Sequence, residues 1–236
     1  MSLPTDVSSR GEARPALRLA AVGGILAVLL AFGIAVAAPR GLVPGLALHL
    51  LGLVVAVRGA ARSYPHDRIG ACNVVTTIRL ALVGGVVALA LEGGPGWAMA
   101  AVAGIALILD GADGWLARRQ GLVSDFGARY DMEVDAALAA CLAVALLAAG
   151  RAGPELLVLG FARYAFVGAA RALPWLTRPL AGSFRRKVVC VVQIGTLVLL
   201  AAPILSDASA RLLALSASTL LLWSFARDIR RLARAR

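Results

Sequence analysis

The sequence contains few of the residues that build metal fingers, disulfide scaffolds or aromatic binding surfaces. Among 236 residues there are one lysine, two histidines and three cysteines, and aromatic residues make up 6%. Cys72, Cys141 and Cys190 are far apart and form no CxxC or Cys/His pattern, which argues against both a disulfide framework and a zinc site. Charged residues amount to only 16%, compared with about 25% in soluble domains.

Apolar residues, in contrast, are abundant. They make up 60% of the chain, and the mean hydropathy is +0.84. Apolar stretches of membrane-spanning length recur along the sequence. The pattern predicts an all-α, polytopic membrane helix bundle with eight candidate spans, at 19–38, 41–57, 74–91, 96–117, 127–149, 154–173, 188–205 and 209–225.

The net charge of +11 comes from basic residues that are distributed by topology. With the N-terminus in the cytoplasm, 19 of the 24 Lys and Arg residues lie in cytoplasmic segments and only Arg40, Arg151 and Arg211 in outer loops. This asymmetry follows the positive-inside rule. We therefore expect a lipid bilayer as the partner of these charges, and no nucleic acid.

The acidic residues are concentrated in one segment. Six of the 13 carboxylates lie between residues 110 and 135, and the flanking runs 96–109 and 136–149 contain only apolar residues and glycine. Each run covers about 21 Å of helix, less than the roughly 30 Å of a bilayer core, so both helices have to continue through the acidic segment. The carboxylates are thus expected at the cytoplasmic margin of the membrane.

The spacing of these acids predicts a shared cavity. Asp110 and Asp113 are three residues apart, and Asp131 and Asp135 four, so each pair shares a helix face. In a hairpin that turns between residues 118 and 127, the two pairs lie at matching depths. Four converging carboxylates need a counter-charge, and oxygen ligands select hard ions such as Mg²⁺, Mn²⁺ or Ca²⁺. Asp125 and Glu133 are interpreted as ordinary turn and surface charges.

Eight positions with fixed spacing can be written as Asp110-x2-Asp113-Gly114-x2-Ala117-Arg118-x8-Gly127-x3-Asp131-x3-Asp135. This pattern resembles the signature of the CDP-alcohol phosphatidyltransferase family without a departure. A second element of the family, Asn73-x2-Thr76-x2-Arg79, precedes it. The resemblance covers residues 73 to 135, and it implies transfer of a phosphatidyl group from CDP-diacylglycerol to a small alcohol, with release of CMP, in phospholipid synthesis.

The resemblance also implies roles for individual residues. Asp110, Asp113 and Asp131 would bind two divalent cations, Mg²⁺ or Mn²⁺, and Asp135 would complete the second site and act as the general base. The residues expected to bind CDP-diacylglycerol are Asn73, Thr76, Gly114, Ala117, Arg118, Ser124 and Gly127. Ser124 is equally well explained as a turn residue and Arg79 as a structural partner of the acids. For Gly114 and Gly127, close helix packing is the alternative to nucleotide binding, and binding is favoured.

The family's six-span core is expected at residues 58–236, preceded by an N-terminal segment, 1–57, with one or two additional spans. The small residues of AVAAPRG, at 35–41, look like a cleavage site, but the 20-residue apolar run exceeds the usual signal core of about 7–15 residues and favours a retained helix. We further expect a homodimer, by resemblance, in a bacterial inner membrane with the active site on the cytoplasmic side.

The acceptor alcohol is suggested by basic residues near the later spans. Arg163 lies within a span, where an ionisable group indicates function, and Arg171, Arg185, Arg186 and Lys187 follow toward the cytoplasm. If they face the acids, they form a pocket for a phosphate, with topology signalling as the alternative for Arg185, Arg186 and Lys187. The expected acceptor therefore carries its own phosphate, with glycerol 3-phosphate ahead of an inositol phosphate.

Two other classes of protein place acids in a membrane. A divalent-cation transporter would show paired broken helices at mid-depth, and the acids here lie near one surface. A metal-dependent membrane prenyltransferase would carry two aspartate-rich clusters far apart in sequence, and this chain has one.

Overall fold

A computed structural model describes residues 8–178 and 183–234, with the side chains from residue 14 onward except that of Asp113. The described residues form eight α-helices, two short 3-10 segments and no strand, which confirms the all-α prediction. The α-helices are α1 (Ser8–Ala37), α2 (Leu42–Ser63), α3 (Ala71–Glu92), α4 (Trp97–Gln120), α5 (Asp125–Ala148), α6 (Glu155–Ala172), α7 (Phe184–Ala201) and α8 (Asp207–Arg234). The 3-10 segments are η1 (Pro39–Gly41) and η2 (Pro174–Thr177).

The predicted spans correspond one to one with the eight helices. Within the described residues, five helical segments are both long and apolar enough to cross a bilayer: Arg14–Ala37, Pro39–Ser63, Ala71–Glu92, Trp97–Gln120 and Asp207–Arg234. Helices α5, α6 and α7 do not meet the same limits of apolar length and charge. The helix count thus agrees with the sequence, and five of these helices are candidate membrane spans by length and composition.

The chain folds as two compact parts. The first contains the residues up to Glu92 together with Ile108–Val134, and the second contains Gly93–Leu107 together with the residues from Asp135 onward. Of the three boundaries between these parts, two fall inside the continuous helices α4 and α5, and the third follows the end of α3.

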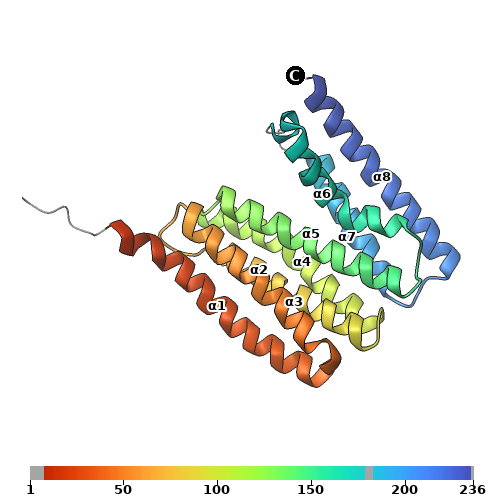
Figure 1. The fold of residues 1–236 in the computed structure, drawn as a ribbon, viewed down its shortest axis with the longest axis horizontal. Coiled ribbons are helices and arrows are strands. Elements are labelled where there is room, and N and C mark those ends of the chain that lie inside the picture. Colours follow the sequence, from red (N-terminus) through yellow and green to blue (C-terminus); the bar gives the residue numbers. More distant parts are fainter. Residues whose placement is uncertain (1–7, 179–182, 235–236) are drawn as a thin grey trace, which may run out of the picture. The chain divides into compact units, whose positions relative to one another are not determined.

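Helices α1, α2 and α3 pack side by side in the first part (Figure 1). Glycines allow α2 and α3 to approach backbone to backbone: a methyl group on Gly45 would lie 2.6 Å from the carbonyl oxygen of Gly84, and one on Gly84 equally close to Gly45. Small residues at such crossings are the usual means of close helix packing in membranes. At one end of these helices, Ile34, Ala38 and Ala88 form a buried apolar cluster.

In the second part, α8 packs against both α6 and α7 (Figure 1). Leucines that are inaccessible to solvent fill this part, among them Leu142, Leu146, Leu156, Leu159, Leu197 and Leu200. Gly160 permits close contact of α6 with α5, because a methyl group there would lie 2.6 Å from the side chain of Ala143. Burying each leucine side chain stabilises the packed state by about 1.5–3 kcal/mol against water, and by less against lipid.

Candidate functional site

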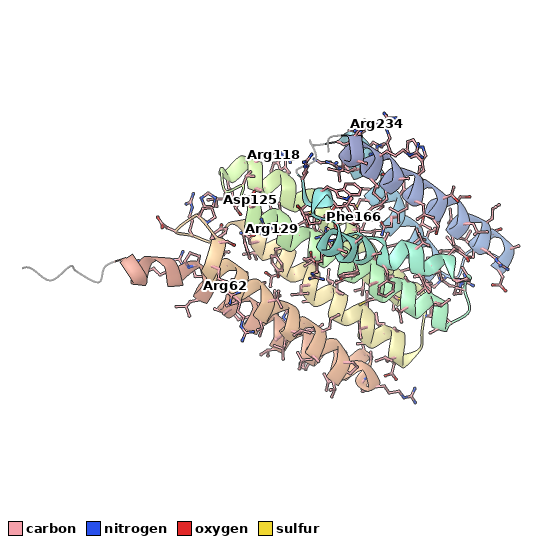
Figure 2. The ribbon with its side chains drawn as sticks, turned by 45° about the horizontal axis from the view of Figure 1, so that its top comes forward. Arg62, Arg118, Asp125, Arg129, Phe166 and Arg234 are labelled. Atoms are coloured by element: carbon pink, nitrogen blue, oxygen red, sulfur yellow. The ribbon has the colours of Figure 1, made fainter. Side chains whose placement is uncertain are left out.

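The acidic segment forms a helical hairpin with a four-residue turn. Gly121, in the left-handed conformation with φ 65°, ends α4. The backbone N–H of Gly121 donates to the carbonyl oxygen of Arg118 (3.3 Å), and the backbone N–H of Leu122 donates to the carbonyl oxygen of Ala117 (3.1 Å). This pair of hydrogen bonds is a Schellman motif. Ser124 then caps α5, because its Oγ accepts a hydrogen bond from the backbone N–H of Gly127 (3.0 Å). Figure 2 shows Arg118 and Asp125 at the joined ends of the two helices.

Three of the four predicted metal ligands come together. One carboxylate oxygen each from Asp110, Asp131 and Asp135 lies within 4.8 Å of the other two, and all three residues are half-buried. Asp131 and Asp135 are one turn apart on α5, as the spacing predicts. Asp113 lies on α4, but its side chain is outside the described part of the structure.

A buried arginine lies against two of these acids. Arg79, on α3, is 1% exposed, and its Nη2 atom lies 3.0 Å from Oδ1 of Asp110. Its Nη1 donates a hydrogen bond to Oδ1 of Asp131. Arg79 therefore connects α3 to both arms of the hairpin and supplies part of the positive charge that the acids require.

The carboxylates fit a divalent cation. Oxygen ligands on opposite sides of one ion lie about 4–5 Å apart at the bond lengths of Mg²⁺ and Ca²⁺, which is compatible with the 4.8 Å limit seen here. The donor set consists of oxygen atoms alone, which hard cations prefer. The cluster can thus bind a metal ion.

Residues predicted to bind the nucleotide lie together where α3 meets the hairpin. A methyl group on Gly127 would lie 3.2 Å from Oγ of Ser124 and 3.3 Å from Oδ1 of Asn73, so these three residues are immediate neighbours. Asn73 and Thr76 are buried, and the Thr76 hydroxyl donates to the carbonyl of Cys72 (3.0 Å). The cap made by Ser124 accounts for this residue structurally, as the alternative interpretation expected.

The remaining nucleotide candidates lie on the last two turns of α4. Arg118 is exposed at the turn, and its Nη1 would be 3.6 Å from a methyl group on Gly114. The guanidinium group of Arg118 thus lies over the side of Gly114 where a side chain would project. Ala117 is half-buried on the same helix. Asp125 and Glu133 are both exposed.

The basic residues predicted for the acceptor have different environments. Arg185 is held by α8: its guanidinium donates to the carbonyl oxygen (3.1 Å) and the hydroxyl of Ser224 and pairs with the buried Asp228. Lys187 and Arg171 are exposed, whereas Arg163 and Arg186 are half-buried. The structure therefore divides these five residues into one held by α8, two exposed and two half-buried.

Of the half-buried pair, Arg186 lies one helical turn from a residue that contacts Asp135. Sγ of Cys190 lies 3.9 Å from Oδ2 of Asp135, and Arg186 is one turn before Cys190 on α7. On the same α7 face, Gln193 donates to the carbonyl of Leu159 on α6. Arg163 lies one turn beyond Leu159, about 6 Å along α6.

Arg79 contacts two of the acids, as the structural alternative for this residue expects. Tyr64, in contrast, belongs to no motif in the sequence. Its hydroxyl contacts Asn73, and no local spacing indicates a contact between an inter-helix segment and a helix face.

The motif, the acid cluster and the apolar helices can now be compared with known proteins. Residues 70–225 match the model of the family described as CDP-alcohol phosphatidyltransferase, which is about two thirds of the chain. A search of curated proteins found no match. The matched region contains both sequence motifs and all three clustered acids, and the apolar helices together with the family indicate an integral membrane protein. The chain belongs to the CDP-alcohol phosphatidyltransferase family, whose members transfer a phosphatidyl group from a CDP-activated donor to an alcohol.

Proposed function

We propose that this protein transfers the phosphatidyl group of CDP-diacylglycerol to the hydroxyl of a small alcohol that carries its own phosphate, with release of CMP. The observation that carries the proposal is the cluster of Asp110, Asp131 and Asp135 inside the complete family signature. Glycerol 3-phosphate is the first candidate acceptor, and an inositol phosphate is the second.

In the proposed reaction the acceptor oxygen attacks the phosphorus atom that bears the diacylglycerol. The bond from that phosphorus to the oxygen of CMP breaks, and Asp135 takes the proton of the attacking hydroxyl. Asp135 is suited to this role because it belongs to the acid cluster and also contacts Cys190 on α7, the helix that carries Arg186.

The other acids are proposed as metal ligands. Asp110, Asp113 and Asp131, with Asp135 for the second site, would hold two divalent cations, Mg²⁺ or Mn²⁺. When bound, such ions neutralise the diphosphate and stabilise the negative charge on the departing CMP. Arg79 holds Asp110 and Asp131 in place from α3.

The donor would be bound at the start of α3 and along the hairpin. Arg118, whose exposed guanidinium group can form two parallel hydrogen bonds to phosphate oxygens, is proposed as a diphosphate ligand. Gly114, Ala117 and Gly127 leave room for the nucleotide beside the backbone. Asn73, Thr76 and Ser124 are proposed to contact the cytidine or its phosphates, which is supported by the proximity of Asn73 and Ser124 to Gly127.

For the acceptor phosphate, Arg163 and Arg186 are the leading ligands of the five basic residues. Both carry charge at half-buried positions, and Arg186 lies one turn from Cys190, which contacts Asp135. An ionisable group within a membrane helix is costly, so it is generally retained for function. Arg171 and Lys187 would attract the acceptor from the cytoplasmic side.

The proposal includes a setting in the cell. We place the protein in a bacterial inner membrane, and the excess of basic residues in predicted cytoplasmic segments supports an active site on the cytoplasmic side. We also propose that residues 58–236 form a six-span core, that residues 1–57 add the N-terminal spans, and that the protein is a homodimer.

The test uses purified protein in detergent micelles with labelled CDP-diacylglycerol. We expect Mg²⁺- or Mn²⁺-dependent release of CMP with glycerol 3-phosphate or an inositol phosphate, and little with inositol, serine or choline. An Asp110→Asn variant serves as the inactive control. Turnover with unphosphorylated alcohols alone would refute the acceptor class, and no CMP release with any alcohol would refute the reaction.

A further inference from the structure

The segment between α2 and α3 contacts the proposed nucleotide site through Tyr64. This tyrosine directly follows α2 and precedes the region that matches the family model. Its ring contacts Phe126, the second residue of α5, edge to face, with ring centres 5.7 Å apart. Phe126 in turn stacks on Tyr130. The Tyr64 ring is thereby held against α5 of the hairpin.

The hydroxyl group of Tyr64 has three hydrogen-bond partners. It donates its single proton to the carbonyl oxygen of Arg68 (3.0 Å). It accepts from the backbone N–H of Gly70 (3.3 Å) and from Nδ2 of Asn73 (3.3 Å). A phenolic oxygen has one proton and two lone pairs, so this set uses its full capacity.

The hydrogen bonds of the Tyr64 hydroxyl fix the orientation of the Asn73 amide. The carbonyl oxygen of Arg68 accepts the only proton of that hydroxyl. The amide group of Asn73 that faces Tyr64 therefore has to be the donor, which is the NH₂ group. The carbonyl oxygen, Oδ1, consequently points the other way, to within 3.3 Å of the position that a side chain on Gly127 would occupy. Burial raises the pKa of the Tyr64 phenol, so its proton remains in place at neutral pH.

We propose that Tyr64 is a positioning residue that holds Asn73 with its carbonyl oxygen toward the nucleotide, so that the site prefers a base with an amino group over one with a carbonyl at the same position. The inference rests on the proposed function. Cytosine carries an exocyclic amino group where uracil carries a carbonyl oxygen. A carbonyl of Asn73 that faces the Gly127 side would accept a hydrogen bond from the amino group of cytosine and repel the carbonyl oxygen of uracil.

Further contacts make the segment stiff enough for this role. Oε1 of Gln120, at the end of α4, accepts from the backbone N–H of Ala71 (2.9 Å). His66 lies 3.3 Å from the carbonyl oxygen of Val123 in the hairpin turn. The inter-helix segment is thus attached to the hairpin on both sides of Arg68.

The experiment measures the relative affinities of CMP and UMP for the purified full-length protein, by competition with CDP-diacylglycerol at a fixed Mg²⁺ concentration. Tyr64→Phe keeps the ring and its contact with Phe126 but removes the hydroxyl, so Asn73 is free to turn. We expect the preference for CMP over UMP to fall about tenfold, the value of one lost hydrogen bond together with one relieved repulsion. KM for CDP-diacylglycerol should rise while kcat stays within about twofold.

Tyr130→Phe is the matched control. It removes a hydroxyl from the ring that stacks on Phe126. That hydroxyl donates to Oγ1 of Thr77 (3.2 Å), not to the Asn73 amide. The control should keep the CMP preference, and thermal unfolding in detergent should show both variants folded.

The outcomes separate the two levels of the proposal. An unchanged CMP preference in folded Tyr64→Phe, or an equal loss in both variants, would overturn the positioning role and leave the proposed reaction intact. Failure of the wild-type protein to bind either nucleotide would overturn the proposed function itself.

Discussion

Nη2 of Arg79, on α3, lies 3.0 Å from Oδ1 of Asp110, on α4, and the arginine is 1% exposed. Its other terminal nitrogen bonds to Asp131 on α5. The same two acids are proposed metal ligands. A permanent cation therefore holds the cluster together from a third helix, and it reduces the repulsion between carboxylates in the absence of metal.

Removing this cation should destabilise the protein. Arg79→Ala leaves two half-buried carboxylates without their partner, and breaking a buried ion pair costs about 3–5 kcal/mol, reduced here because both acids are partly exposed. We expect a lower Tm in detergent, and a larger increase in Tm on addition of Mg²⁺ than in the wild type. The Tm of Arg79→Lys, which keeps the charge, should lie between the Tm of the wild type and that of Arg79→Ala. Equal Tm values with and without the arginine would contradict this role.

Loss of Asp135 should lower kcat, whereas loss of Asp110 should weaken donor binding. Asp135→Asn should lower kcat by about 10²–10⁴-fold, the usual contribution of a general base, while CDP-diacylglycerol binding stays within a few-fold. Asp110→Asn should weaken metal-dependent binding itself. Glu133→Gln, at an exposed position of α5, is the control. The division of roles fails if both aspartate variants lose donor binding equally.

A methyl group at Gly127 should interfere with the donor. It would lie 3.2 Å from Ser124 and 3.3 Å from Asn73, closer than most side-chain contacts, so one of these groups has to move. Gly127→Ala should raise KM for CDP-diacylglycerol several-fold. Gly33→Ala on α1, where an added methyl group meets no packing neighbour within 4 Å, tests the general effect of alanine in a helix. Similar kinetics in both variants would show that Gly127 serves packing alone.

Arg185 should stabilise the pair of α7 and α8. Because its guanidinium pairs with the buried Asp228, Arg185→Ala and Asp228→Ala should each cost about 3 kcal/mol of stability, and the double variant little more than either alone. Both single variants should also change the acceptor KM to the same extent. Arg186→Ala should raise the acceptor KM without a comparable loss of Tm. An acceptor defect in Arg185→Ala that Asp228→Ala does not share would instead assign Arg185 to the phosphate.

Membrane topology can be tested by cysteine labelling after replacement of the three native cysteines. Single cysteines at Arg62, Arg119 and Arg186 should react only from the cytoplasm, and those at Gly94 and Gly153 only from outside. Labelling of the Gly94 and Arg119 positions from the same side would exclude the membrane hairpin.

The sequence alone was sufficient for the features that depend on local spacing. Long apolar runs predicted the positions of the eight helices, because helix formation in a membrane follows from apolar length. The four-residue separation of Asp131 and Asp135 predicted their shared face, because the helical period is fixed. The motif predicted the family, which the match over residues 70–225 confirms.

Tertiary structure decided which side chains meet across long sequence separations. Arg79 lies 31 and 52 residues from its two acidic partners, and Tyr64 accepts from the Asn73 amide through the path of an irregular segment. Arg185 was expected near a phosphate, and its pairing with Asp228 on α8 depends on how that helix packs. Such contacts arise from the packing of whole helices, whose rotation and depth are set by many side chains at once. Local periodicity specifies the face of each helix, and only the fold specifies what that face meets.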